Sequence, residues 1–287
     1  MTTGGERRSI DAPESRAKAE GHPEEEQPTE ACAAAADPPN AGGGAARPSP
    51  SIAACIRYSP DFLAREEADQ LRRDVAAAKG WQELSGRRLL SLGGLVTPKG
   101  LVPSPLLPRW LPPLMSRAAD RAGFAPDAPP NHALVNLYRP GEGILPHEDG
   151  PAYEPRVAIA SIGSPAVLRF WRRAGPGGGG GGAAPAPVPG VDPPDASVLL
   201  EPRSLVVFEG EAYAGCYHGI EACEAETIDA SVINPPPTLP PPGQGASSAP
   251  SAAAASVVLP RDGDRVSLTI RRVSRVRPLL RLGPGAG

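Results

Sequence analysis

Aromatic residues, histidines and cysteines are all scarce in this chain. Only 4% of its 287 residues are aromatic, and it has four histidines and four cysteines. The cysteines show no C-x-x-C spacing, which excludes a zinc ribbon and gives no sign of a disulfide framework. No apolar run approaches the roughly 18 residues of a membrane-spanning helix, and the N-terminus lacks the apolar stretch of a secretory signal. We therefore expect a soluble intracellular protein with reduced thiols and no membrane partner.

A large excess of charge is lacking as well. The formal net charge is −3. Residues 1–50 contain nine acidic side chains against five basic ones, which gives them a local charge of −4 and leaves +1 for the remainder. A nearly neutral domain has only a weak electrostatic attraction for nucleic acid, so the overall charge does not identify a partner.

Glycine and proline, in contrast, are abundant, with 33 and 39 residues. Residues 1–50 are acidic and then rich in Ala, Pro and Gly, so they bury too little apolar surface to order and are predicted to form a disordered tail. Residues 175–195 and 235–256 have the same character and are predicted surface insertions, because long loops close at little entropic cost. With a flexible C-terminus at 279–287, one domain remains, at 51–278.

The ordered segments read as helices first and strands afterwards. The stretch from 59 to 80 has helical apolar spacing, with its N-cap at Ser59 or Asp61 and its end at Gly80. A second helix is predicted to start at Pro112 or Pro113 and to stop at Gly123. The strand-like runs that follow are ALVNLY (133–138), RVAIASIG (156–163), AVLRFW (166–171), SVLLE (197–201), SLVVFEG (204–210) and RVSLTIRRV (265–273). This order predicts an α+β domain, an antiparallel sandwich or barrel braced by N-terminal helices.

A histidine and an aspartate stand two positions apart in NLYRPGEGILPHEDGPAYEP, residues 136–155. Alternate side chains of a strand share a face, so His147 and Asp149 can reach one ion while Glu148 points away. An imidazole and a carboxylate are two of the three ligands in the two-histidine, one-carboxylate set that binds Fe(II). By itself, however, an H-x-D spacing is also found around ordinary surface imidazoles.

Few residues can supply the third ligand. His22 falls in the predicted tail and His132 begins a strand, which leaves His218 in GCYHGIEA. This histidine follows the strand-like run SLVVFEG and a bend at Gly215. It is therefore the candidate that we expect beside the H-x-D pair.

The last strand-like run has one polar and one apolar face. By strand parity, Arg265, Ser267, Thr269 and Arg271 lie on one side, and Val266, Leu268 and Ile270 lie on the other. An arginine-lined face that looks inward suits an anion, and guanidinium recognises carboxylate bidentately, so Arg265 is a candidate for binding a dicarboxylate. A solvated basic edge strand is the alternative for this run taken alone.

Four motifs thus occur in a fixed order along the chain. They are Asn136-x-Tyr138, His147-x-Asp149, His218, and Arg265 with Arg271 as R-x-x-x-x-x-R. In this order they resemble the motif series of the AlkB-like Fe(II)/2-oxoglutarate dioxygenases. The resemblance spans roughly residues 55–275 and is interrupted by the two predicted insertions.

The resemblance implies a double-stranded β-helix, or jelly roll, with His147, Asp149 and His218 as iron ligands and catalytic residues. It implies Fe(II) as cofactor and 2-oxoglutarate and O2 as co-substrates. Oxidation of 2-oxoglutarate to succinate would be coupled to hydroxylation of a C–H bond, and an N-methyl group hydroxylated in this way is released as formaldehyde. Residues 86–95 and the following loop would form a lid over the substrate.

The resemblance also assigns the co-substrate contacts. Asn136 and Tyr138 would contact 2-oxoglutarate, Arg265 would pair with its distal carboxylate, and Arg271 would lie close to co-substrate and substrate. Ser267 stands where other members have Asn, which puts a direct contact to 2-oxoglutarate in doubt at this position.

An N-alkylated nucleic acid base, in a single strand or flipped out of a duplex, is the expected substrate. The C-terminal stretch contains seven arginines, of which Arg265 and Arg271 are already assigned to the pocket. The other five, Arg261, Arg272, Arg275, Arg277 and Arg281, could track phosphates, and Trp81 or Trp110 could stack on a base. The alternatives are a protein hydroxylase or demethylase on the same jelly roll and a non-catalytic binding module. A monomer in nucleus and cytoplasm is expected.

Overall fold

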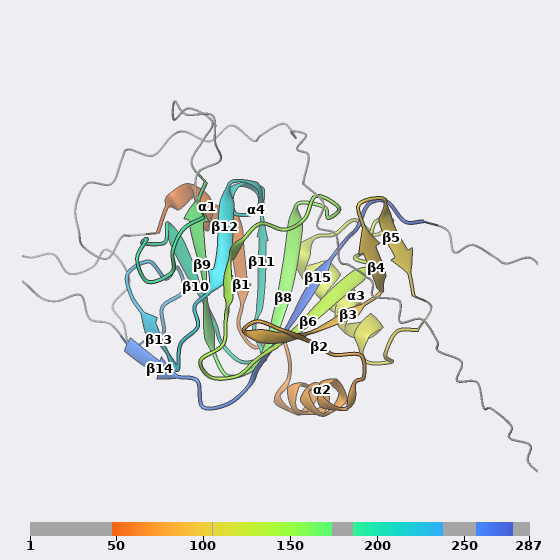
Figure 1. Cartoon of the computed structure of the whole chain (residues 1–287), viewed down its shortest axis with the longest axis horizontal. Coiled ribbons are helices and arrows are strands. Elements are labelled where there is room, and N and C mark those ends of the chain that lie inside the picture. The colour runs from red at the N-terminus through yellow and green to blue at the C-terminus, as the bar shows by residue number, and fades with distance from the viewer. Residues whose placement is uncertain (1–47, 105, 174–185, 238–256, 278–287) are drawn as a thin grey trace, which may run out of the picture. The chain divides into compact units, whose positions relative to one another are not determined.

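The structure, a computed structural model, describes residues 48–104, 106–173, 186–237 and 257–277. Two antiparallel sheets make up most of this part of the chain (Figure 1). The larger sheet contains β1 (Ile56–Ser59), β2 (Gln82–Leu84), β3 (Arg87–Leu92), β6 (His132–Tyr138), β8 (Arg156–Gly163), β11 (Leu205–Glu209) and β15 (Arg265–Arg271). The smaller sheet contains β7 (Ile144–His147), β9 (Ala166–Arg172), β10 (Ala196–Leu200) and β12 (Cys216–Ile220).

Besides these two sheets, the described residues form two pairs of antiparallel strands and four helices. The first pair is the hairpin of β4 (Gly94–Thr97) with β5 (Gly100–Pro103), and the second is the two-stranded sheet of β13 (Ala225–Ile228) with β14 (Val257–Pro260). The helices are α1 (Pro50–Ala54), α2 (Arg65–Ala77), α3 (Leu111–Ala122) and α4 (Gly210–Ala214). No helix among the described residues is long and apolar enough to cross a membrane.

The strand order identifies the fold. The large sheet runs β1-β11-β8-β15-β6-β3-β2 and the small sheet β10-β9-β12-β7. Eight strands of the two sheets therefore follow the chain in the order large, small, large, small, small, large, small, large, from β6 to β15. This alternation between two facing antiparallel sheets is that of a double-stranded β-helix, so the predicted jelly roll is confirmed.

Each face of the large sheet has its own hydrophobic core. Successive side chains of a strand point to opposite faces. On β15, this places Val266, Leu268 and Ile270 in a hydrophobic cluster with α2 and α3, which cover the outer face of the sheet. The inner face packs on the small sheet through a second cluster, in which Phe208 and Phe170 are both fully buried. Helices brace one side of the sandwich, as the sequence predicts, and the space between the sheets stays available for a site.

The first predicted helix begins later than expected. Neither Ser59 nor Asp61 is its N-cap, because Ser59 ends β1 and α2 starts at Arg65. Between them Asp61 adopts a left-handed backbone, with φ of 51°, and such a residue cannot continue a helix. The second helix is confirmed: α3 runs from Leu111 to Ala122 and ends at Gly123, whose φ of 74° is a left-handed cap.

All six predicted strand-like runs are strands, with ends that differ by at most two residues. Beyond these six runs, the described residues contain nine further strands, which are β1 to β5, β7, β12, β13 and β14. Eight of them have only three to five residues, too short for a periodic pattern.

The predicted insertion at 175–195 is narrower than expected. Residues 186–195 lie within the described part, where the Asp192 carbonyl accepts a hydrogen bond from the indole of buried Trp171 at 3.0 Å. The Asp195 carboxylate accepts the backbone N–H of Arg172 at 2.7 Å. Hydrogen bonds at Asp192 and Asp195 thus tie this part of the segment to β9. Residues 1–47, 174–185, 238–256 and 278–287, where the other predicted tails and insertions fall, lie outside the described residues.

This difference can be tested by replacing each half of the segment with Gly and Ser at constant length. For residues 175–185 we expect the melting temperature to stay within about 2 °C of wild type. For residues 186–194 the replacement removes four prolines and the Asp192 carboxylate that accepts the Val188 N–H at 2.7 Å, so we expect a loss of roughly 1–3 kcal/mol in unfolding free energy. Thermal unfolding by circular dichroism measures both. Equal melting temperatures for the two variants would contradict the packing of residues 186–195.

Candidate active site

A cavity of about 1040 Å³ opens beside the inner face of the large sheet. Polar side chains of β15 line it, namely Arg265, Ser267, Thr269 and Arg271, and they are the four that strand parity places on one face. The small sheet contributes the opposite wall from β7, β9 and β12. The volume is at the upper end of the range for small-molecule sites, which leaves room for two ligands side by side.

His147, Asp149 and His218 meet in this cavity, although 69 positions separate the aspartate from the second histidine. β7 and β12 are adjacent antiparallel strands in which His147 and His218 are directly opposite each other, and their ring centroids are 4.4 Å apart. One ligand atom from each of the three residues lies within 4.8 Å of the others. The predicted convergence is therefore observed, with His218 on a strand and Asp149 just beyond the end of β7.

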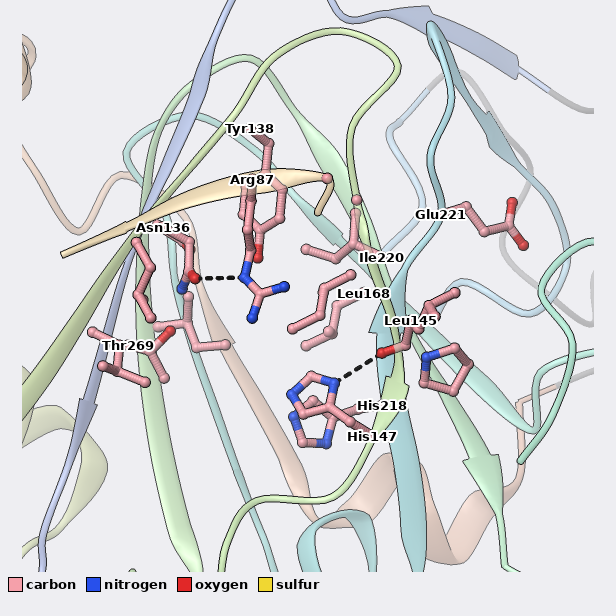
Figure 2. A pocket seen from close by; sticks show the side chains of 18 of the residues that line it. Arg87, Asn136, Tyr138, Leu145, His147, Leu168, His218, Ile220, Glu221 and Thr269 are labelled. Atoms are coloured by element: carbon pink, nitrogen blue, oxygen red, sulfur yellow. Dashed lines mark hydrogen bonds between the residues drawn. The ribbon is translucent and has the colours of Figure 1, made fainter. Parts of the chain in front are cut away.

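The imidazoles of His147 and His218 are both neutral, so each can offer a nitrogen lone pair to a metal ion. His147 Nδ1 donates to the Leu145 carbonyl at 2.9 Å, which leaves Nε2 free to face the cavity (Figure 2). His218 is buried among aromatic rings, with the Phe208 centroid 5.1 Å from its own. Burial lowers the pKa of His147 and lowers that of His218 to about 3. A metal therefore does not have to displace a proton from either ring at neutral pH.

Asp149 keeps one oxygen occupied and the other open. Its Oδ1 accepts a charge-assisted hydrogen bond from Arg271, and both side chains are more than nine-tenths buried. Its Oδ2 is buried and has no partner among the described residues. Because an unpaired buried carboxylate oxygen is costly, Oδ2 is suited to a cation that arrives beside the two imidazoles.

A chain of contacts holds Arg271 in place. The guanidinium carbon lies 4.1 Å from the centroid of the Tyr153 ring. The Tyr153 hydroxyl is 3.1 Å from His132 Nδ1, and His132 Nε2 is 3.0 Å from the Ser91 hydroxyl. Burial and the nearby Arg271 lower the pKa of His132 to about 4, so a neutral ring bridges two hydroxyls. His132 is not a ligand, as the sequence suggests, but it supports the side chain that orients Asp149.

Arg265 is the most unusual charge in the cavity. It is 2% exposed, yet its Nε and Nη1 have no partner among the described residues. Nη2 donates to the Ser161 hydroxyl at 3.1 Å, and the guanidinium carbon lies 5.5 Å from the Tyr138 ring centroid. Burial lowers the pKa of Arg265 to about 10, partly offset by Tyr138, so the group is still cationic at pH 7. Two open N–H donors on a buried cation form a site for a carboxylate.

The other predicted co-substrate residues lie on the same face. In the register of β6 and β15, Asn136 is opposite Ser267 and Tyr138 is opposite Arg265. All four line the cavity. Arg87, at the start of β3, also enters the cavity, and its Nε donates to Asn136 Oδ1 at 3.0 Å. Sequence reasoning missed Arg87, since the stretch that contains it lacks a clear strand pattern.

One expectation about the cavity rim is wrong and another stays a prediction. In residues 86–95, β3 pairs with β6 in the large sheet, and its inner-facing side chains with the preceding turn line the cavity; whether this stretch and the following loop cover a substrate stays a prediction. Trp81 and Trp110 do not line the cavity. Both are partly buried against the outer core, and Trp81 has the Arg88 guanidinium 5.1 Å from its ring centroid. Neither indole is placed to stack on a base in this site.

The C-terminal arginines also divide differently from the expectation. Arg261 is buried in an ion pair with Glu226, and Arg272 pairs with Glu154 at 2.7 Å. Arg275 and Arg277 remain exposed. They flank Val276, which bridges to Leu101 of β5, so both project from the same side of that short extension. Arg281 lies outside the described residues.

The donor set fits the two groups that the motif series implies. Two neutral imidazoles and one open carboxylate oxygen match a site for Fe(II). The buried guanidinium of Arg265, which has open donors and no carboxylate partner among the described residues, fits one carboxylate of a dicarboxylate such as 2-oxoglutarate. The three expected metal ligands and all five expected co-substrate residues line one cavity.

Comparison with known proteins agrees with this chemistry. The profile of the 2OG-Fe(II) oxygenase superfamily matches residues 97–271. The chain is 35% identical over 226 residues to "Probable RNA/DNA demethylase ALKBH6" of Danio rerio, which covers 77% of this chain and 86% of that protein. It is 32% identical over 132 residues to "Alpha-ketoglutarate-dependent dioxygenase AlkB" of Escherichia coli (strain K12), covering 45% and 53%. The solved structure of OsALKBH1 superimposes with a TM-score of 0.43 at 17% identity, covering 76% of this chain and 98% of that one.

The Tyr153 contact predicts an effect on metal affinity. Replacing Tyr153 with Leu removes the ring beneath Arg271, which loosens the Asp149 carboxylate, so we expect the affinity for Mn(II) to fall about tenfold. Tyr153→Phe keeps the ring and loses only the hydroxyl contact to His132, so a smaller loss is expected. Calorimetric titration of the metal-free protein measures both. Wild-type affinity in Tyr153→Leu would show that Asp149 is oriented without this ring.

Proposed function

Because this chain belongs to the 2OG-Fe(II) oxygenase superfamily and is a 2-oxoglutarate-dependent dioxygenase, we propose that it removes N-alkyl groups oxidatively from nucleic acid bases. The observation that carries the choice of substrate is the positive charge of the cavity. The similarity to a zebrafish protein named as a probable RNA/DNA demethylase supports the same choice.

The cavity keeps excess positive charge after its own ligands are counted. Three guanidiniums line it, those of Arg87, Arg265 and Arg271, against the single carboxylate of Asp149. The other acidic residue of the lining, Glu221, is paired with Arg169 at 3.4 Å. The charges of Fe(II) and of the 2-oxoglutarate dianion cancel each other. Three guanidiniums and one carboxylate therefore leave an excess of two positive charges in the cavity. This field attracts the phosphates of a nucleic acid strand, which favours this substrate class over the protein-demethylase alternative.

The roles of the residues follow from their contacts. His147, Asp149 and His218 would hold Fe(II), which when bound activates O2 for oxidation of 2-oxoglutarate and of a substrate C–H bond. Arg265 would bind the distal carboxylate of 2-oxoglutarate through its unpartnered guanidinium N–H groups. Asn136 and Tyr138, on the neighbouring strand, would hold the rest of the co-substrate in one orientation.

Other side chains surround the reacting end of the cavity. Arg271 neutralises Asp149 from one side, so the carboxylate turns its free oxygen to the metal position. Leu168 and Ile220 line the wall beside the two imidazoles (Figure 2). Such an apolar wall strengthens the charge–dipole contacts within the site.

Arg265 gives a direct prediction. Replacing it with Met removes two carboxylate donors but leaves the three metal ligands untouched, so we expect the KM for 2-oxoglutarate to rise about 10- to 100-fold. Mn(II) affinity is expected to stay within threefold of wild type. Arg272→Met is the matched control, since Arg272 pairs with Glu154 outside the cavity. An unchanged KM in Arg265→Met would remove this residue from the co-substrate site.

The proposed activity is tested with single-stranded DNA and RNA that carry a panel of N-methylated bases. We expect formaldehyde and succinate in equal amounts, only with Fe(II), O2 and 2-oxoglutarate present, and no product from Asp149→Ala. Since Arg275 and Arg277 project together from one exposed face, replacing both with Ala is expected to reduce the salt slope of single-strand binding by about 1.4. Turnover of a methylated peptide panel but of no oligonucleotide would overturn the substrate class.

A further inference from the structure

Arg87 is a third guanidinium in the cavity. Strand parity on β3 puts Arg87 and Leu89 on the inner face, and Leu89 is opposite Asn136 in the register with β6. Both line the cavity, whereas Arg88 points to the outer face, where it pairs with Glu83 at 2.7 Å. In Figure 2 the Arg87 guanidinium extends from β3 toward the two histidines, with its terminal nitrogens in open space.

The position of Arg87 is fixed by its surroundings. The turn that precedes it uses Gly86 at φ of +78°, and a Cβ at Gly86 would lie 2.9 Å from the Gly143 carbonyl oxygen. The turn is thus pressed against the segment between β6 and β7. Nε donates to Asn136 Oδ1 at 3.0 Å, which sets the plane of the guanidinium and directs Nη1 and Nη2 into the cavity. A side chain whose backbone and Nε are both held loses little further conformational entropy when its terminal nitrogens bind a ligand.

No anion that the proposed function supplies is left for Arg87. One carboxylate of 2-oxoglutarate belongs to the metal and the other to Arg265. Asp149 is taken by Arg271. No carboxylate among the described residues forms an ion pair with Arg87 within 4.0 Å, although the side chain is half-buried. A fixed, half-buried cation with two open donors calls for a separate anion.

We propose that Arg87 binds a phosphate of the substrate, namely the one attached to the nucleotide whose base enters the cavity. This inference rests on the proposed function and names the subsite by which it would select a nucleotide over a free nucleoside. Guanidinium matches phosphate oxygens bidentately, and in a low-dielectric wall this contact is stronger than one on an open surface. The phosphate would then set how deeply the base can enter.

A 2-oxoglutarate contact is the competing role for Arg87, because Asn136 lies between this residue and the co-substrate position. The two roles differ in which affinity responds. Loss of a phosphate contact affects only ligands that carry phosphate. Loss of a co-substrate contact affects 2-oxoglutarate whether or not a substrate is present.

The test compares wild type, Arg87→Gln and Arg88→Gln, each loaded with Mn(II) and 2-oxoglutarate so that no turnover occurs. The first probe is inorganic phosphate, whose binding is measured by the broadening of its 31P signal near paramagnetic Mn(II). The second is a pair of ligands, the nucleoside 1-methyladenosine and its 5′-monophosphate, whose affinities are measured by calorimetry. We expect wild type and Arg88→Gln to bind the monophosphate about 10- to 100-fold more tightly than the nucleoside. In Arg87→Gln this preference and the broadening should be lost, while 2-oxoglutarate affinity falls less than threefold.

Three results would overturn the phosphate subsite. They are a phosphate preference that survives in Arg87→Gln, a tenfold loss of 2-oxoglutarate affinity in that variant, and an absence of broadening in wild type. The proposed function fails separately. If phosphate binds through Arg87 but no methylated oligonucleotide is oxidised, the subsite stands and the substrate is another phosphorylated molecule.

Discussion

Two buried guanidiniums on β15 are the constraint on which the rest of the site depends. A cation between two sheets is tolerated only where an anion meets it, since desolvation of an unpaired charge costs several kcal/mol. Arg271 has Asp149 as its partner, whereas Arg265 has only a hydroxyl and an aromatic ring. The strand thus carries one satisfied and one unsatisfied positive charge, six residues apart. The unsatisfied charge is what makes this space between the sheets a binding site for an anion.

The same strand couples the two ligands of the cavity. Arg271 pairs with Asp149, the carboxylate that we propose as a metal ligand, and we propose that Arg265 binds the carboxylate of the co-substrate. Their outward neighbours Val266, Leu268 and Ile270 are buried under α2 and α3, so the helices hold the strand and thereby fix the distance between metal and co-substrate. The packing on the outer face and the polar groups on the inner face therefore depend on each other, because both come from alternating side chains of the single strand β15.

The sequence predicts those parts that have a periodic or motif signal. The alternation of RVSLTIRRV identified the inner and outer faces of β15, and the H-x-D pair with His218 identified residues that meet in space. It did not predict Arg87 or the support of Arg271 by Tyr153 and His132, since these contacts join β3, β6 and the loop after β7, which are far apart in sequence. Trp81 and Trp110 were misassigned because composition cannot tell an indole that packs on the core from one that faces a ligand.

We propose that one cavity holds Fe(II) against His147, Asp149 and His218 and 2-oxoglutarate against Arg265. The most direct measurement is a crystal structure with Mn(II) and 2-oxoglutarate, with the metal located by its anomalous scattering. We expect a single metal peak about 2.1 Å from one atom of each of the three residues, with the distal carboxylate on the Arg265 guanidinium. A metal bound elsewhere, or a distal carboxylate on Arg87 with Arg265 still unpaired, would contradict it.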